Sequence, residues 1–494
     1  MKRSPTSWCA LPLLLAGLPA QELGDTWGTG HAEAAYYRIV TLPLPRELNL
    51  EAGSFCVLPD GQLAVGTRRG EILLIRGAFD EIPRPQVHRF ATGLDEVLGL
   101  SYRDGAFYAT QQTELTRIRD RDGDGRADRF ENLSDVWGFG NYHEFAWGSP
   151  VMPDGSVTVV LGLSESYHYK ADYRGWAFQI TQDGRSIPIA SGIRSAGGVA
   201  PNEHGVMFYA ESQGPWNGSC SLKHLRPGGF MGHPVSFPGY DLPLGRQLGP
   251  RPAEPSSQSR LASESERIPE LVPYAVVFPY RKMGQSITTF RVDTTQGRFG
   301  PFAGQLFLGD YSLSCVMRAT TELVDGVWQG ACHPFREGFG NGILACEFSP
   351  TGHLITGGTN RGWPVRGNQS FVLERLEWTG VVPFEVERIT ARPDGFRVVF
   401  TLPVDADRAA NPASYTLSSY THVFQQGYGS PEVDHTTPRV RSAVVAADRR
   451  SVQLVVDGLV QGHVHEFDFG GVRAQDGAPL LHTKAYYTLN RIPK

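Results

Sequence analysis

The stretch Pro153-Asp154-Gly155, followed by Val157-Thr158-Val159-Val160, contains the unit that decides the fold: a turn ending in glycine and then a short β-rich run. The unit recurs with its glycine at positions 61, 105, 155, 205, 304 and 352, and most intervals are 44 to 50 residues. This is the length of a four-stranded blade, and blades stack radially because none can bury both faces alone. The repeats therefore predict an all-β protein whose main part, residues 30–380, is a β-propeller.

The interval from Gly205 to Gly304 is about twice as long as the others, so the number of blades could be six or seven. Residues 239–269, within this interval, are rich in Pro, Ser and Arg, a composition typical of a loop. We therefore expect six blades, with a loop insertion at 239–269.

The pattern changes after Gly380. Apolar and polar residues alternate at 396–402 and again at 451–456, and this period of two predicts strands with one buried face. We expect a separate immunoglobulin-like β-sandwich over residues 383–494. Three of its histidines have no matched carboxylate or cysteine cluster and are expected to face solvent: His463, His465 and His482.

The first residues, 1–20, have the layout of a secretory signal peptide. Two basic residues precede the apolar stretch 8–18, and Ala20 is a small residue at the expected cleavage site. The alternative is a buried N-terminal helix. No later stretch is apolar for long enough to be transmembrane. We expect a periplasmic or secreted protein.

The overall charge restricts the partners. A formal net charge of −5 gives no basic field, which argues against nucleic acid as a partner. Of the 6 cysteines, Cys9 lies in the predicted signal peptide. The remaining number is odd, so at least one thiol is free or pairs outside the chain. We expect most of them to be small buried hydrophobic residues.

The segment 120–131 (DRDGDGRADRFE) has the spacing of a calcium loop. Calcium requires six to eight oxygen ligands, and the glycine at the sixth position allows the sharp turn that brings them together. The alternative is an acidic, solvated surface turn. If the loop binds calcium, we expect a structural role. The residues at its ligand positions are Asp120, Asp122, Asp124, Arg126, Asp128 and Glu131.

Three polar residues could carry chemistry. His143 would lie at the start of an inner strand, where it could act as a general base in the central channel or simply hydrogen-bond within a blade junction. Arg194 opens the fourth blade, and Arg361 follows the turn of the last one. Either guanidinium could bind a carboxylate ligand in a bidentate manner or pair with a neighbouring blade.

Several motifs, in this order, resemble the sorbosone and soluble glucose dehydrogenase superfamily of six-bladed quinoprotein propellers: residues 93–100, 141–145, 192–195 and 230–234. A second resemblance, to the exported "membrane-bound dehydrogenase-like" propellers of planctomycetes, spans nearly the whole mature chain. It is carried by residues 114–117, 120–131, 141–145, 174–176, 300–305, 358–363, 428–431 and 487–490.

The resemblance implies oxidation of a sugar hydroxyl by bound pyrroloquinoline quinone, with His143 as the base. Glu96 would lie near the edge of the cofactor, and Arg194 would bind its carboxylates, with Arg361 as a further candidate. A lysine that faces the cofactor in the sugar enzymes falls near Ser312 here, so that contact is missing. The chain also has no haem domain, which implies a separate c-type cytochrome as electron acceptor.

We therefore expect an exported, quinoprotein-like sugar or polyol dehydrogenase that uses calcium. The alternative is a non-catalytic propeller that binds a glycan or a protein, with the sandwich as a spacer or docking module. A third class, a lactonase-type hydrolase with calcium in the channel, is disfavoured because the calcium motif falls in a peripheral loop.

Overall fold

The structure is a computed structural model that describes residues 27–165 and 167–494. The predicted signal peptide lies outside the described residues. Nearly all regular structure is β-strand, and the described part of the chain contains no helix long and apolar enough to cross a membrane. Its strands form seven sheets, which we number one to seven in the order in which they are introduced.

The first three sheets are antiparallel meanders, except that sheet three gains a short parallel strand at its outer edge. Sheet one contains β2 Ala52–Val57, β3 Leu63–Thr67, β4 Ile72–Arg76 and β5 Gln86–Ala91. Sheet two contains β6 Gly99–Arg103, β7 Ala106–Thr110, β8 Leu115–Arg119 and β9 Arg129–Ser134. Sheet three contains β10 Ala146–Trp147, β11 Val157–Leu161, β12 Trp176–Ile180, β13 Ser186–Ser191 and β17 Gly229–Phe230.

The next three sheets continue the series. Sheet four contains β14 Ala196–Pro201, β15 Met207–Glu211, β16 Cys220–His224 and β18 Tyr274–Phe278. Sheet five begins with β19 Ile287–Val292, β20 Leu306–Asp310, β21 Cys315–Val324 and β22 Val327–Glu337. Sheet six contains β23 Gly342–Phe348, β24 Leu354–Thr359, β25 Leu373–Trp378 and, at its outer edge, β1 Tyr37–Thr41. The last sheet is thus completed by a strand from the beginning of the chain.

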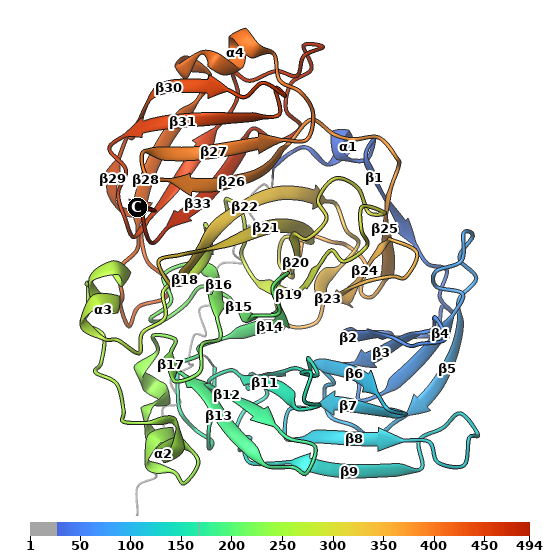
Figure 1. The fold of residues 1–494 in the computed structure, drawn as a ribbon. Helices are drawn as coiled ribbons and strands as arrows, with labels where there is room; N and C mark the ends of the chain where they lie inside the picture. Colours follow the sequence, from blue (N-terminus) through green and yellow to red (C-terminus); the bar gives the residue numbers. More distant parts are fainter. Residues whose placement is uncertain (1–26, 166) are drawn as a thin grey trace, which may run out of the picture.

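These six sheets follow one another around a common centre (Figure 1). Their innermost strands are in contact in the order β2, β6, β10, β14, β19 and β23, and β23 contacts β2 again. Where β6 meets sheet three, a Cβ on Gly99 would lie 2.3 Å from the carbonyl carbon of Gly148, so the two backbones approach too closely for a side chain. The arrangement is β-propeller-like.

The glycines of the sequence repeat lie in the turns that lead into the second strand of each sheet. All six have a φ between +73° and +90°, a left-handed conformation that glycine adopts without steric cost. The recurring glycine in the sequence is therefore required by the turn geometry.

The segment predicted as a loop insertion lies between β16 and β18 and contains short helices. They are the 3-10 helix Pro234–Asp241, α2 Gly245–Leu248 and α3 Leu261–Arg267. Because β18 returns to pair with β16, this segment lengthens one connection of sheet four. Among the described strands it forms no additional sheet, and this explains the doubled glycine interval.

The C-terminal part forms two facing layers. Sheet seven contains β26 Val386–Arg392, β27 Gly395–Phe400, β31 Ser451–Asp457 and β30 Arg439–Val445. The second layer consists of β33 Lys484–Leu489, β32 His463–Asp468, β28 Thr416–Thr421 and β29 Val433–Thr436. Phe396 of one layer and Phe467 of the other belong to a common buried core, and α4 Ala406–Ala410 packs beside β30.

The sequence pattern suggested a separate sandwich, but the second layer is joined to the ring. β33 pairs with β22, and the register joins Gly330 to Thr488 and Cys332 to Tyr486. The eight strands therefore form one continuous sheet that passes from sheet five into the C-terminal part, which is visible beside β21 and β22 in Figure 1.

The expectation that the three C-terminal histidines face solvent is wrong. His465 is fully buried against Phe396, and His463 lies within hydrogen-bond distance of Ser419. The Nε2 atom of His482 lies 2.9 Å from Glu33, in α1 Gly30–Glu33, and its Nδ1 atom lies 2.5 Å from Glu385. The alternation of polar and apolar residues alone could not predict that these histidines are buried. The inner faces of both C-terminal layers are covered, and His482 also contacts the N-terminal segment.

Five cysteines are described, and all are free. Four of them are fully buried and Cys56 is partly buried. Burial raises the pKa of the Cys56, Cys220 and Cys346 thiols to about 12. These residues are small apolar side chains of the core, as expected.

Candidate active site

The predicted catalytic and cofactor-binding residues lie at one end of the ring because of how each sheet is threaded. The innermost strand of every sheet starts at this end and the second strand returns to it. Glu51, Glu96, His143 and Arg194 come shortly before innermost strands, and Arg361 follows a second strand. We call this end the mouth.

A network of charged side chains links sheets six, one and two at the mouth. The Glu96 Oε1 atom lies 2.9 Å from Nη2 of Arg68 and 3.3 Å from Nη2 of Arg361. Arg361 also places Nε 2.8 Å from the Glu51 carboxylate, which Arg69 approaches at 3.3 Å. Two of the predicted residues, Glu96 and Arg361, are thus brought together although 265 positions separate them in sequence.

The two carboxylates of this network are held in an unusual state. Glu51 and Glu96 have φ values of +32° and +38°, a strained conformation for residues other than glycine that is often found at functional sites. Burial raises the pKa of Glu96, although Arg68 and Arg361 oppose this shift. The Oε2 atom of Glu96 is buried without a hydrogen-bond partner.

His143 lies in an aromatic environment at the mouth. Its ring centroid is 3.9 Å from that of Tyr142, 4.6 Å from that of Trp363 and 6.3 Å from that of Phe145. Burial lowers the pKa of His143, and the nearby positive charge of Arg68 lowers it further, while Glu165 acts in the opposite direction. Burial therefore favours the neutral imidazole, which can accept a proton.

A fully buried arginine fixes the segment that carries His143. Arg174 donates to the carbonyl oxygens of Gly138 at 2.8 Å, Glu144 at 2.6 Å and Gln112 at 2.7 Å. Its guanidinium also lies 3.7 Å from the Glu144 carboxylate. Burial lowers the pKa of Arg174 to about 10, against the pull of Glu144. These bonds hold the backbone on both sides of His143.

Arg194 belongs to a neighbouring cluster at the same mouth. The segments that carry His143 and Arg194 both bond to the residues that follow β11. Gly162 N–H donates to the Phe145 carbonyl, and Leu163 N–H donates to the Arg194 carbonyl, each at 2.9 Å. The Arg194 guanidinium donates to the carbonyls of Ser212 and Gln213. Among the described residues, no ion pair, hydrogen bond or ring contact joins its side chain to His143.

Sequence reasoning missed Arg68 and Glu51. A signal was available in the repeat: Gly66-Thr67-Arg68-Arg69-Gly70 after the second strand of sheet one parallels Gly358-Thr359-Asn360-Arg361-Gly362 after that of sheet six. Ser312, at the position where the related sugar enzymes have a lysine, lies at the mouth and donates to Ser286 Oγ at 3.1 Å.

The predicted calcium loop connects β8 to β9 at the outer edge of sheet two. Carboxylate oxygens of Asp120, Asp122 and Asp124 lie within 4.8 Å of one another. Asp120 accepts from the N–H groups of Gly123 at 2.7 Å and Gly125 at 2.9 Å, which wraps the loop around these oxygens. Arg126 N–H donates to Asp124, and Asp128 accepts from Arg121 N–H.

The placement of Glu131 differs from the expectation that it is the twelfth ligand. Its carboxylate accepts from Arg117 at 2.8 Å, Arg119 at 2.9 Å and Arg129 at 3.1 Å. The arginines lower the pKa of Glu131 to about 2, with the Arg117 hydrogen bond as the largest cause. Strand β9 starts at Arg129, and this directs Glu131 into the sheet edge instead of the loop.

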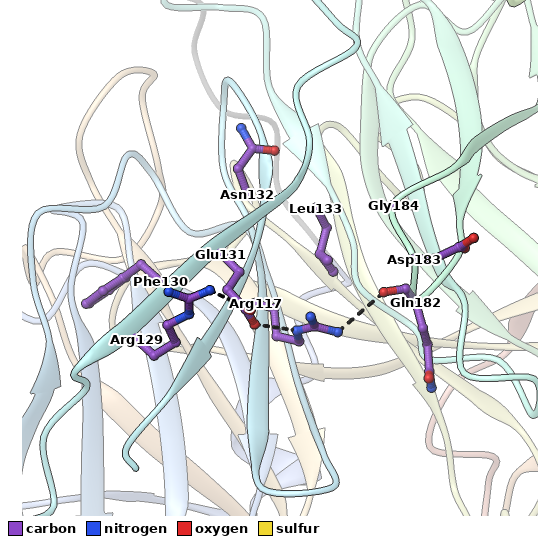
Figure 2. Close-up of a pocket in the computed structure, with 9 residues that line it drawn as sticks. All are labelled: Arg117, Arg129, Phe130, Glu131, Asn132, Leu133, Gln182, Asp183 and Gly184. Carbon is purple, nitrogen blue, oxygen red and sulfur yellow. Dashed lines mark hydrogen bonds and ion pairs between the residues drawn. The ribbon is translucent and has the colours of Figure 1, made fainter. Parts of the chain in front are cut away.

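Arg117, Arg129 and Glu131 also border a polar cleft of about 490 Å³ on the outer rim. Figure 2 shows Arg117 between Glu131 on β9 and the Gln182 carbonyl in the turn that joins β12 to β13. This cleft is lined by none of the mouth residues described above. At the cleft, the hydrogen bond from Arg117 to the Gln182 carbonyl joins the outer parts of sheets two and three.

No protein-family model matches the chain, and a search of curated proteins gives no match. Solved structures similar to it include a protein of Thermus thermophilus assigned as an oxidoreductase (glucose dehydrogenase), with 18% identity, 69% of this chain and 99% of that chain covered, and a TM-score of 0.49. A PQQ-bound aldose sugar dehydrogenase of Streptomyces coelicolor has 16% identity, coverage of 69% and 99%, and a TM-score of 0.46.

A third similar structure is a family AA12 carbohydrate-active enzyme of Trichoderma reesei. It has 12% identity, covers 73% of this chain and 99% of its own, and gives a TM-score of 0.48.

Proposed function

We propose that this protein is a sugar or polyol dehydrogenase whose active site is the mouth of a six-bladed propeller formed by sheets one to six. The observation that carries the proposal is the position of His143, whose ring packs on Trp363 at the same mouth as the Arg68–Glu96–Arg361 network. Burial lowers the pKa of His143, which favours the neutral form that a general base requires.

Oxidation of a hydroxyl removes a proton from oxygen and a hydride from carbon, and leaves a carbonyl. His143 takes the proton on a ring nitrogen. Arg174 and Glu144 position the histidine, and the surrounding rings of Tyr142 and Trp363 limit its access to water. Proton transfer to a positioned base contributes about 10²–10⁴-fold to such a reaction.

The mouth offers a fit for pyrroloquinoline quinone, which would supply the two-electron acceptor for the hydride. Arg194 is 6% exposed, and its buried Nε atom has no hydrogen-bond partner. Its backbone N–H donates to Glu211, but within the described part of the chain its guanidinium donates only to carbonyl oxygens and forms no ion pair with a carboxylate. It is therefore suited to a ligand carboxylate. Arg361 is 52% exposed at its side chain and could exchange one of its carboxylate contacts for the ligand. Ser312 cannot replace the charge of a lysine.

We further propose that the loop 120–128 binds one calcium ion with a structural role. The three clustered carboxylates and the wrapped backbone support this proposal, and hard oxygen ligands in this spacing favour calcium. Asp128 and the Arg126 carbonyl would complete the shell, without Glu131.

The remaining assignments are proposals of the same kind. Residues 1–20 would direct export to the periplasm or the outside of the cell, residues 383–494 would form an immunoglobulin-like unit, and the electrons would pass to a separate c-type cytochrome. Detection of the mature N-terminus after Ala20 in an exported fraction would test the first of these.

Calorimetric titration with pyrroloquinoline quinone, with and without calcium, tests the main proposal, followed by dye reduction with a panel of sugars and polyols. We expect micromolar binding and quinone-dependent oxidation of at least one sugar. His143→Gln should lower kcat by at least about 100-fold while retaining quinone binding. His204→Gln is the matched control, because His204 lies in the β14–β15 turn at the opposite end of the ring.

Absence of quinone binding in the unmodified protein would contradict the dehydrogenase proposal. Binding of a glycan without quinone, unaffected by His143→Gln, would instead support a non-catalytic binding propeller.

A further inference from the structure

A loop of the C-terminal part reaches the mouth of the ring. The connection between β28 and β29, residues 422–432, lies on the segment that follows β15 of sheet four. Trp216 N–H donates to the Gln425 carbonyl at 2.8 Å, and Ser430 N–H donates to the Gly218 carbonyl at 3.0 Å. We call residues 422–432 the bridging loop.

The loop is seated closely on its partner segment. Gly429 has a φ of +66°, and a Cβ at this position would lie 2.5 Å from the side-chain amide of Gln213. Phe424 packs in a buried cluster with Trp216 and Phe230. Because β15 ends at the mouth, these contacts fix the bridging loop at the mouth.

The tip of the loop places an aromatic ring over Arg194. The Arg194 guanidinium carbon lies 5.2 Å from the centroid of the Tyr428 ring, within the range of a cation–π contact. Tyr428 is 53% exposed, so a large part of its ring is free for a ligand. A tyrosine combines an apolar face with a polar tip, which suits the alternating apolar and hydroxyl surface of a sugar ring.

We propose that Tyr428 is a specificity-determining residue: it forms one wall of the mouth above Arg194 and packs against the sugar ring of the substrate. This inference rests on the proposed function, because it takes the mouth as the substrate site. It assigns part of the site to the C-terminal region, since Tyr428 lies 285 residues beyond His143 in sequence.

Kinetics of the quinone-loaded protein provide the first test. Tyr428→Ala should raise KM for the sugar about tenfold with kcat nearly unchanged, the result expected when an interaction common to ground and transition states is lost. Tyr428→Phe keeps the ring and should stay within about threefold of the unmodified protein. Phe130→Ala is the matched control, since Phe130 is an exposed aromatic residue on the outer rim.

A second test needs neither quinone nor turnover. The described native cysteines are buried or partly buried, so the thiol of Tyr428→Cys should react fastest. Because the Arg194 charge attracts anions, this thiol should prefer anionic dithionitrobenzoate over neutral dithiodipyridine. The preference should be several-fold greater than that of the same thiol in a protein that also carries Arg194→Gln.

The outcomes separate the two proposals. Unchanged KM in Tyr428→Ala, in a protein that binds quinone and oxidises sugar, would overturn the role of Tyr428 alone. A Tyr428→Cys thiol without any Arg194-dependent preference would overturn the placement of the wall. Failure of the unmodified protein to bind quinone, with the labelling preference intact, would overturn the dehydrogenase and the substrate role of Tyr428 but leave its position at the mouth supported.

Discussion

The indole ring of Trp363 packs on the imidazole of His143, with centroids 4.6 Å apart and planes inclined by 35°. His143 precedes the innermost strand of sheet three and Trp363 follows the second strand of sheet six, so the contact crosses the mouth between sheets that are three positions apart in the ring. The Tyr311 hydroxyl, which donates to the Arg361 carbonyl at 2.8 Å, holds this connection in place. The environment of the proposed base is thus set by a distant segment.

Trp363→Ala should shift the pH dependence of activity. Burial lowers the pKa of His143, and removing the indole exposes the imidazole, so its pKa should rise towards the ordinary value of about 6.5. Since the base must be neutral, the decline of kcat/KM on acidification should begin at a higher pH in the variant. Trp363→Phe is the control and should retain most of the original profile. An unchanged acidic limb in Trp363→Ala would contradict this role.

Arg68→Gln should destabilise the fold measurably. The pair formed by Arg68 and Glu96 is mostly buried, with side chains 9% and 13% exposed, and removing one partner of a buried pair costs about 3–5 kcal/mol. Urea unfolding should show a drop towards the lower end of this range, because Arg361 still faces Glu96. Arg89→Gln breaks an ion pair in which the arginine is 58% exposed, and it should cost less than about 1 kcal/mol. Equal losses in both variants would refute the distinction.

Stability should fall at alkaline pH because of His482. Burial opposes its protonation, but the Glu385 and Glu33 carboxylates raise the pKa of His482 to about 9. This folded-state pKa lies above the unfolded value of about 6.5, so the contribution is complete below pH 6.5 and is lost as pH rises through 9. Unfolding free energies measured from pH 6 to 10 should therefore decline more steeply in the native protein than in His482→Gln. Parallel curves would exclude this residue as the cause.

Calcium should raise the melting temperature through the loop 120–128. At a hundredfold excess over Kd, binding stabilises a folded protein by about 2.7 kcal/mol. Asp124→Asn should abolish most of the calcium-dependent shift in differential scanning fluorimetry, whereas Glu131→Gln should preserve it because Glu131 is engaged with three arginines. A calcium response lost equally in both variants would restore Glu131 as a ligand.

Local sequence signals predicted the features that depend on local geometry. The repeat glycines marked turns that need a positive φ, and their spacing gave the ring of sheets. The same regularity placed His143, Arg194 and Arg361 at one end. His143 and Arg194 precede innermost strands, which start at the mouth, and Arg361 follows a second strand, which ends there. The clustering of Asp120, Asp122 and Asp124 was likewise encoded within a few residues.

Features that depend on pairing between distant segments were not predictable in this way. The sequence of residues 484–489 is the same whether β33 pairs within a separate sandwich or with β22, and it contains no signal for the second pairing. The burial of His482 depends on Glu33, which is 449 residues away. The spacing of Glu131 fits a calcium loop, but the loop sequence does not show that Arg117 and Arg119 on β8 and Arg129 on β9 contact its carboxylate.

The pairing of β33 with β22 also restricts how this protein can be divided. A fragment that ends before residue 484 would leave the edge of β22 at Gly330–Cys332 with unpaired N–H and C=O groups, which is a template for association with another chain. The ring would be expected to aggregate when expressed without its C-terminal strands. Recombination or gene truncation that separates the two parts is therefore disfavoured, and they are best regarded as one inherited folding unit.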